Sequence, residues 1–287
     1  MRGGQGGQRL IGAASGRQHN CGGTDAGIDS ARILREQYKD GSNLSARIRP
    51  HQRFSTNRYG FFLWMFDRIQ IPENARVLEL GCGTGALWRG SVKVPRGWRA
   101  ILTDMSDGML REARSSLALF DRSFTYSQAD AQAIPFRDES FDAVIANHML
   151  YHVPDISRAL GEVRRVLKPS GFCYAATMGL ANMKEMNELA ARFFSIPRMT
   201  DSTARFGLES GEAYMRSAFS EVRLERYPDS LVFTEAAPLM DYICSMRVRS
   251  RVTDKQIAAL RAHVENEIAT HGEIQMTKDS GLFIARS

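Results

Sequence analysis

The sequence lacks the features that would place the protein in a membrane or in an oxidising compartment. No run of 18 apolar residues occurs among its 287 residues, so no segment is predicted to span a membrane. Its four cysteines form no CxxC pair and have no metal-ligand spacing, which predicts reduced thiols and no structural zinc site. We therefore expect a cytoplasmic protein that is a monomer or a homodimer.

Dense blocks of one charge are also absent. The chain carries 38 Lys and Arg against 32 Asp and Glu, a formal net charge of +6. This excess would suit an anionic partner, but the basic residues are spread along the chain rather than gathered in a run. Charge therefore gives little support for nucleic-acid binding.

The N-terminal region differs from the rest of the sequence. Residues 1–29 contain nine glycines and no periodic apolar face, which predicts a disordered Gly-rich tail. Residues 30–70 are predicted to form an N-terminal helical cover, because Phe54–Ile69 carries apolar residues at helical spacing. Within that cover, Tyr38–Phe54 is either a lid over a ligand or a solvated basic segment.

Strands and helices alternate after Pro72. Helices are predicted after each of the first two strands and at Ile156–Val166, and strands separated by helices indicate a parallel sheet. We expect an α/β fold: a doubly wound, mainly parallel seven-stranded sheet with helical lid additions. The predicted strands are Arg76–Leu80, Arg99–Thr103, Ser123–Gln128, Phe141–Asn147, Gly171–Thr177, Val222–Tyr227 and Leu282–Ala285. Further helices are predicted at Ala181–Phe194, Glu209–Phe219, Glu235–Met246 and Thr253–Thr270.

Three glycines follow the first predicted strand in the stretch VLELGCGTG, residues 77–85. Glycines in that position allow a tight turn and a close approach of the backbone to a ligand. The same stretch satisfies the dinucleotide pattern G-x-G-x-x-G/A, with Asp104 about 20 residues farther on as a ribose ligand. The glycines alone therefore leave NAD and other adenosine cofactors open, and Glu79 and Asp130 are what favour the latter. Asp104 could instead cap the helix that starts near Asp107, and Asp130 could be only a turn residue.

Four ordered blocks make the sequence resemble a known family, the class I S-adenosylmethionine (SAM)-dependent methyltransferases, in their type 11-like small-molecule branch. The matching blocks are VLELGCGTG (77–85), ILTDMSDGML (101–110), QADAQAIPFRDESFDAVIANHMLYHVPD (128–155) and VRRVLKPSGFCYAAT (163–177). The resemblance implies a SAM-binding methyltransferase domain over residues 71–287, with a helical insertion around 179–220. Methyl transfer would convert SAM to S-adenosylhomocysteine.

The resemblance also implies roles for individual residues. The glycine turn should hold the methionine part of SAM beside Glu79, and Asp104 should accept the ribose hydroxyls with Met105 packed on the adenine. Asp130 and Ala131 should read the adenine amino group, and Asn147 should lie under the sulfonium. The expected cofactor-binding residues are Glu79, Gly81, Cys82, Gly83, Gly85, Asp104, Met105, Asp130, Ala131 and Asn147. Cys82 is expected to pack as a small apolar side chain rather than to act as a nucleophile.

Two histidines near the end of the fourth predicted strand are candidate general bases, because histidine titrates near neutral pH. Their i, i+4 spacing would suit a metal on a helix, but position 149 is Met, so the H-E-x-x-H pattern is absent and no metal is predicted. His152 precedes Val-Pro-Asp, so the alternative to a catalytic role is a structural role at the start of the next helix. His148 is therefore the preferred base.

The acceptor is less well defined by the sequence. Tyr38, Arg47 and Tyr151 are candidate substrate contacts, and the predicted reaction is methyl transfer to an oxygen or nitrogen of a small molecule, with secondary metabolism as one setting. A nucleic-acid methyltransferase is the first alternative, but Asn147-His148-Met149-Leu150 lacks the prolines and aromatic of the base-amino motif. A protein that binds the cofactor without methyl transfer is the second alternative.

Overall fold

The computed structural model describes residues 49–90, 94–120, 122, 124–194, 204–245 and 252–286. The predicted tail at residues 1–29 lies outside this part of the chain. So do two predicted substrate contacts, Tyr38 and Arg47.

The described residues form one seven-stranded sheet with the strand order β3-β2-β1-β4-β5-β7-β6. Strands β1 to β5 are parallel to one another, and β7 is antiparallel to both of its neighbours. The strands are β1 (Arg76–Leu80), β2 (Arg99–Asp104), β3 (Phe124–Gln128), β4 (Phe141–Asn147), β5 (Leu167–Met178), β6 (Glu221–Phe233) and β7 (Ile274–Arg286). The predicted fold class, a doubly wound and mainly parallel seven-stranded sheet, is confirmed.

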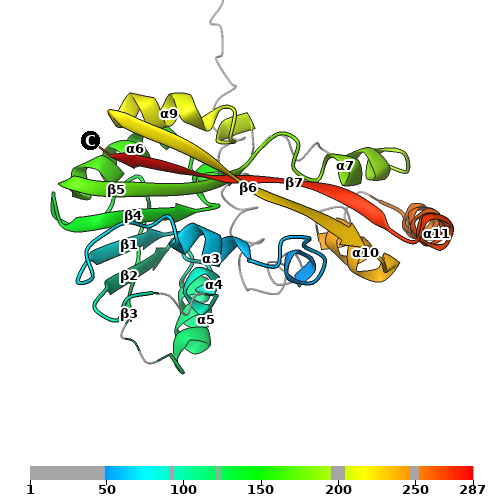
Figure 1. Ribbon diagram of the computed structural model, residues 1–287, viewed down its shortest axis with the longest axis horizontal. Coiled ribbons are helices and arrows are strands. Elements are labelled where there is room, and N and C mark those ends of the chain that lie inside the picture. Colours follow the sequence, from blue (N-terminus) through cyan, green and yellow to red (C-terminus); the bar gives the residue numbers. More distant parts are fainter. Residues whose placement is uncertain are drawn as a thin grey trace, which may run out of the picture.

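Helices cover both faces of this sheet (Figure 1). One face packs against α3 (Phe61–Phe66), α4 (Ala86–Arg89) and α5 (Asp107–Leu117) through a core that includes Trp88 and Leu102. The other face packs against α6 (Ile156–Val166) and α9 (Gly211–Ala218) through a core that includes Val144 and Phe283. Both helices α5 and α6 begin at a capped position, because the Ser106 and Asp155 side chains accept the backbone N–H three residues on.

A hairpin of two long strands extends the sheet beyond the carboxyl ends of the parallel strands. The last residue of β5, Met178, pairs with Ser280 in the middle of β7, which in turn pairs with Tyr227 in the middle of β6. The halves Pro228–Phe233 and Ile274–Asp279 therefore project past the sheet, as Figure 1 shows. We call them the projecting ribbon.

A third hydrophobic core surrounds the projecting ribbon. Its helices are α7 (Lys184–Ala191), α10 (Ala236–Ser245) and α11 (Asp254–His271), and Leu231 and Met276 of the ribbon are fully buried among them. Helix α11 starts with a capping box formed by Thr253 and Gln256. The sequence predicted these helices and the inner halves of both strands. It missed the outer halves because Asp229, Ser230, Lys278 and Asp279 interrupt the apolar pattern.

The predicted helix at Phe54–Ile69 is shorter than expected. Residues 49–53 are helical, but Ser55 forms an antiparallel bridge with Leu231 of the ribbon, and the chain becomes helical again only at α3. The Asn57 backbone N–H and the Ser55 hydroxyl both donate to Asp229, so tertiary hydrogen bonds replace those of a continuous helix. This segment therefore lies against the ribbon.

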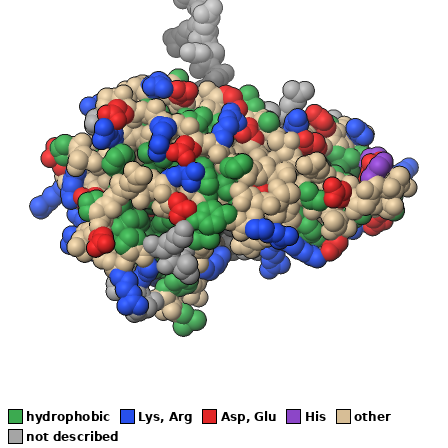
Figure 2. Space-filling model, in the orientation of Figure 1, with side chains coloured by type: hydrophobic (Ala, Val, Ile, Leu, Met, Phe, Trp, Pro, Cys, Tyr) green, Lys and Arg blue, Asp and Glu red, His purple; other side chains and the backbone are tan. Residues whose placement is uncertain are grey.

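None of the helices in the described ranges combines the length and the apolar character needed to cross a membrane. Figure 2 shows acidic and basic side chains interspersed over one face of the molecule, with no single basic stripe on that face.

Candidate active site

The glycine turn after β1 has the backbone geometry that its sequence predicts. Gly81, Gly83 and Gly85 have φ values of 65°, 54° and 75°, in the left-handed region that favours glycine. A Cβ atom at Gly81 would lie 2.8 Å from Cβ of Met149, so even a methyl group would clash there. The turn is therefore both strained for other residues and too crowded for them.

Glu79 is a buried acid without a basic partner among the described side chains. Its Oε2 atom accepts a 2.6 Å hydrogen bond from the Trp88 indole. Burial raises the pKa of Glu79 to about 8, the charge of Asp104 acts in the same direction, and the Trp88 hydrogen bond opposes the shift. A cationic group bound here would favour the ionised carboxylate, so Glu79 fits a ligand that carries an ammonium.

Asp104 ties the glycine turn to the end of β2. Its Oδ2 atom accepts the Gly83 N–H at 2.9 Å, and its Oδ1 atom accepts the Ser106 N–H at 2.8 Å. Burial raises its pKa in spite of these hydrogen bonds. Because Ser106 is the residue that caps α5, the alternative in which Asp104 is the helix cap is wrong.

The groups expected around an adenine lie at the adjoining strand ends. Met105 is 60% exposed, which is unusual for a large apolar side chain at the end of a buried strand and leaves it free to pack on a ring. Asp130 follows β3, and its carboxylate accepts the Gln132 N–H at 2.8 Å, while Ala131 is buried. Asp130 is thus a turn residue as well as a candidate ligand.

His148 stands at the end of β4 in an unusual backbone conformation. Its φ is 53°, and its N–H donates to the Ala176 carbonyl of β5 at 3.0 Å. The ring packs at 5.4 Å from that of Phe61. Its Nδ1 atom and Oδ1 of the neighbouring Asn147 are buried and have no hydrogen-bond partner among the described residues. Burial, assisted by the charge of Lys278, lowers the pKa of His148 to about 4, so the ring is neutral at pH 7.

A buried ion pair on the projecting ribbon lies beside His148. Lys278 Nζ is 2.6 Å from Oδ2 of Asp229, and the two side chains are only 9% and 0% exposed. Asp229 also accepts the Ser55 hydroxyl at 2.7 Å and the Asn57 N–H at 3.0 Å. Although burial opposes the shift, the Lys278 and Ser55 hydrogen bonds hold the pKa of Asp229 below its usual range. Sequence reasoning missed this pair, because a lone Asp and a lone Lys in separate strands carry no motif.

The segment before α3 brings a second histidine to this site. His51 is in the helical residues 49–53, and its ring meets Tyr242 edge-on at 5.8 Å. Its buried Nδ1 atom has no hydrogen-bond partner in the described ranges. Burial lowers its pKa to about 3, with smaller contributions from Lys278 and His148, while Asp229 opposes them. Residues 38–48 lie outside the described part of the chain, so the choice between a lid and a solvated segment for Tyr38–Phe54 stays a prediction.

Three further predicted residues, Tyr151, His152 and Cys82, have contacts within the described structure, and their predicted roles stay predictions. His152 ends a 3₁₀ turn at Leu150–His152, and its ring meets Tyr151 edge-on at 4.5 Å. Cys82 is buried, and burial raises the pKa of its thiol far above the usual range, so it packs rather than reacts. Within the described ranges, no group of three or more His, Cys, Asp or Glu is placed to hold a metal.

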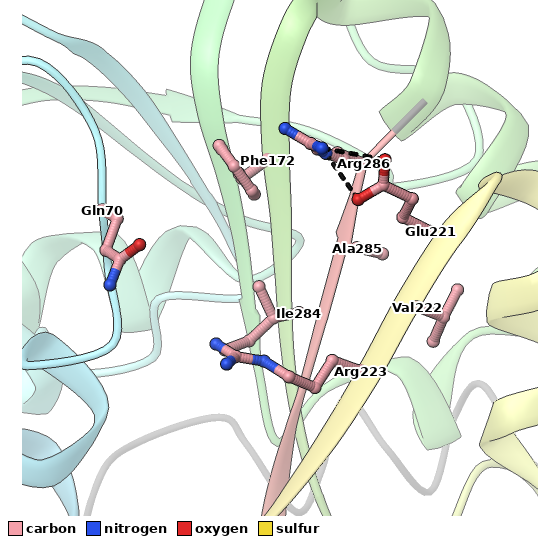
Figure 3. Close-up of a pocket in the computed structure, with 8 residues that line it drawn as sticks. All are labelled: Gln70, Phe172, Glu221, Val222, Arg223, Ile284, Ala285 and Arg286. Carbon is pink, nitrogen blue, oxygen red and sulfur yellow. Dashed lines mark hydrogen bonds and ion pairs between the residues drawn. The ribbon is translucent and has the colours of Figure 1, made fainter.

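A depression of about 340 Å³ lies at the other end of the strands (Figure 3). Phe172 of β5 pairs in register with Arg286 of β7, which forms an ion pair with Glu221 at the start of β6. These residues mark the amino ends of the parallel strands. The depression is therefore separate from the site that Asp104 and His148 define.

The two buried histidines make the stability of the protein sensitive to acid. Because their folded pKa values of about 4 and 3 are below the ordinary 6.5, the unfolded chain binds more protons as the pH falls. The stabilisation is complete above pH 6.5 and is lost towards pH 4. Between pH 8 and pH 5, we expect each histidine to contribute a loss of about 2 kcal/mol of unfolding free energy, while the raised pKa of Glu79 contributes a gain of opposite sign in both the wild type and a variant without the histidines.

Urea unfolding at the two pH values would test this expectation. The double variant His51→Asn and His148→Asn should lose about 4 kcal/mol less than the wild type over this range. His271→Asn, which removes a histidine that is 62% exposed, is the control and should behave as the wild type. An equal loss in the double variant and the wild type would contradict the assignment.

Comparison with known proteins adds a family to this geometry. Residues 78–175 match the family model described as a methyltransferase domain. The chain is 34% identical over 140 residues to the ubiquinone/menaquinone biosynthesis C-methyltransferase UbiE of Pectobacterium carotovorum, covering 47% of this chain and 55% of that protein. It is 30% identical over 177 residues to the malonyl-[acyl-carrier protein] O-methyltransferase of Geobacter sulfurreducens, covering 56% and 64%. The chain thus spans less than two thirds of either relative.

A solved structure has the same fold. Phosphoethanolamine N-methyltransferase 2 of Haemonchus contortus, in complex with S-adenosyl-L-methionine, is similar with a TM-score of 0.55 and 16% identity, covering 90% of this chain and 60% of that one. At this level of identity the similarity concerns the fold alone.

Proposed function

From the premise that the chain contains a class I SAM-dependent methyltransferase domain, we propose that it transfers a methyl group from SAM to an oxygen or nitrogen of a small molecule. The family and the cofactor predicted from the sequence are both confirmed. What supports the proposed acceptor is a single observation: a neutral histidine, His148, with an unpartnered buried Nδ1 atom at the end of β4.

We assign the cofactor to the carboxyl ends of β1, β2 and β3, where open α/β sheets bind their ligands. The methionine part would meet the glycine turn and Glu79, and the ribose would meet Asp104. The adenine would lie between Met105 and the Asp130–Ala131 turn. SAM supplies the reactive methyl group when bound, so the protein has to orient the acceptor, exclude water and take up its proton.

His148 would carry the proton. It is held by the backbone at the end of β4, next to Asn147, and its imidazole is neutral at pH 7, the form that a general base has before it takes a proton from the acceptor. The Phe61 ring of α3 packs against the imidazole at a tilt of 43°, with 5.4 Å between the ring centroids. A methyl acceptor that must lose a proton, such as a hydroxyl or an ammonium, suits this arrangement.

The cofactor assignment predicts a large loss of affinity in Asp104→Ala. The substitution removes the proposed ribose ligand and also frees the Gly83 N–H from its anchor. We expect S-adenosylhomocysteine to bind at least tenfold more weakly, about 1.4 kcal/mol, in calorimetric titration. The control is Asp107→Ala, which changes an exposed acid that pairs with Arg111 on α5 and should leave the affinity unchanged.

Formation of S-adenosylhomocysteine with panels of hydroxyl, amine and carbon acceptors tests the proposed reaction. Mass spectrometry and NMR of the product identify the methylated atom. A product methylated on oxygen or nitrogen supports the proposal. Methylation only on carbon, only on nucleic acid, or cofactor binding without turnover on any panel would each contradict it.

A further inference from the structure

Within the described part of the chain, three buried polar atoms around the carboxyl end of β4 have no hydrogen-bond partner: Oδ1 of Asn147, Nδ1 of His148 and Nδ1 of His51. The buried hydroxyl of Tyr227, which packs beside Phe61, is a fourth. Buried polar atoms are paired in more than about nine cases in ten, so this group of unpartnered atoms points to a polar group that binds there. Asn147 and His148 are contributed by the sheet, and His51 by the N-terminal segment. The charge of His148 affects the pKa of His51, which places the two rings near each other.

Aromatic side chains surround these unpartnered atoms. The Phe61 ring lies 5.4 Å from that of His148, and the Tyr242 ring lies 5.8 Å from that of His51. Tyr227 packs edge-on against Phe61 at 5.4 Å and carries the Lys278 ammonium over its face at 5.0 Å. Such surroundings favour a flat ring with a polar group directed at the histidines.

The charges of the site restrict that polar group. Lys278 lowers the pKa of both histidines, although it is paired with Asp229. Its positive charge therefore acts at the position where the acceptor would lie. A protonated amine would meet this charge and that of the sulfonium. A hydroxyl is uncharged, can donate to one imidazole and can accept from the other.

We propose that His51 and His148 together hold the hydroxyl group of an aromatic acceptor, so that the substrate is a phenol and His51 is one of its contacts. This inference rests on the proposed function. The phenolic oxygen forms a bond to the methyl carbon while the carbon–sulfur bond breaks, with its electron pair going to sulfur. The phenolic proton passes to Nδ1 of His148, and His51, in the tautomer with a proton on Nδ1, donates to the same oxygen.

The acidity of the hydroxyl supports a phenol over an alkanol. A base with a pKa near 4, as for His148, is weak, so proton transfer to it is favoured by an acidic donor. A phenolic hydroxyl has a pKa of about 10, whereas that of water, which an alkanol resembles, is about 15.7. Negative charge that develops on the phenolic oxygen would also be stabilised by Lys278.

Calorimetric titration of the S-adenosylhomocysteine complex with phenol, benzyl alcohol and benzylamine tests the inference. Two substitutions separate hydrogen bonding from ring packing: His51→Asn keeps a polar atom near the position of Nδ1, and His51→Phe keeps a ring. Arg53→Gln, on the same helical residues but exposed and paired with Glu235, is the matched control.

The expected result is that phenol binds at least tenfold more tightly than either analogue. His51→Phe should lose at least tenfold in phenol affinity, His51→Asn should stay within about threefold of the wild type, and Arg53→Gln should be unchanged. Equal affinities for the three ligands, or equal losses of phenol affinity in the two His51 variants, would overturn the inference. If S-adenosylhomocysteine still binds in that case, the proposed function stands. Failure of S-adenosylhomocysteine itself to bind would overturn both.

Discussion

His148→Asn should lower kcat by about 10²- to 10⁴-fold without weakening cofactor binding, because it removes a general base and leaves the glycine turn intact. Asparagine tolerates the positive φ of this position and keeps a hydrogen-bonding atom near Nδ1, but it cannot take up a proton. Steady-state kinetics with an acceptor found in the panel, together with calorimetric titration of S-adenosylhomocysteine, measures both effects.

His152→Asn is the matched comparison for this variant. His152 lies four residues farther along and packs against Tyr151, so we expect its replacement to change kcat by no more than a few-fold. A greater loss of kcat in His152→Asn than in His148→Asn would reverse the assignment of the base. Both variants must bind S-adenosylhomocysteine with equal affinity. Only then does a difference in kcat report on the acceptor side of the site.

Asp229→Asn should destabilise the protein by about 3–5 kcal/mol, because it leaves the buried Lys278 ammonium without its counter-ion. The substitution keeps the shape of the side chain, so the loss would come from the charge and from weaker hydrogen bonds to Ser55 and Asn57. Urea unfolding at pH 7 gives the change in free energy.

The control for this prediction is Glu235→Gln. Glu235 also ties the N-terminal segment to the region beyond the ribbon, through Arg53, but that pair is exposed and should contribute less than about 1 kcal/mol. Equal stability of Asp229→Asn and Glu235→Gln would show that the buried pair does not hold the segment in place.

The cofactor half of the site could be predicted from the sequence because its residues lie in short stretches with a fixed relation to strands. Glu79 lies within β1, the three glycines follow it and Asp104 ends β2, and a parallel sheet brings the ends of such strands together. Their positions at strand ends therefore follow from local patterns alone.

The acceptor half could not be predicted in the same way. Asp229 and Lys278 are 49 residues apart in sequence and meet only because β6 and β7 pair along their full length. His51 belongs to a segment whose polar composition suited a solvated surface as well as a lid. Tertiary hydrogen bonds from Ser55 and Asn57 to Asp229 hold the chain just after this segment against the ribbon, and they interrupt the helix predicted at Phe54–Ile69.

Calorimetric titration of the wild-type protein with S-adenosylhomocysteine, with NADH in parallel, tests the central claim most directly. We expect saturable binding of S-adenosylhomocysteine with one site per chain and no binding of NADH at the same concentrations. Binding of NADH in preference to S-adenosylhomocysteine, or of neither ligand, would contradict the assignment of the glycine turn, Glu79 and Asp104 to SAM.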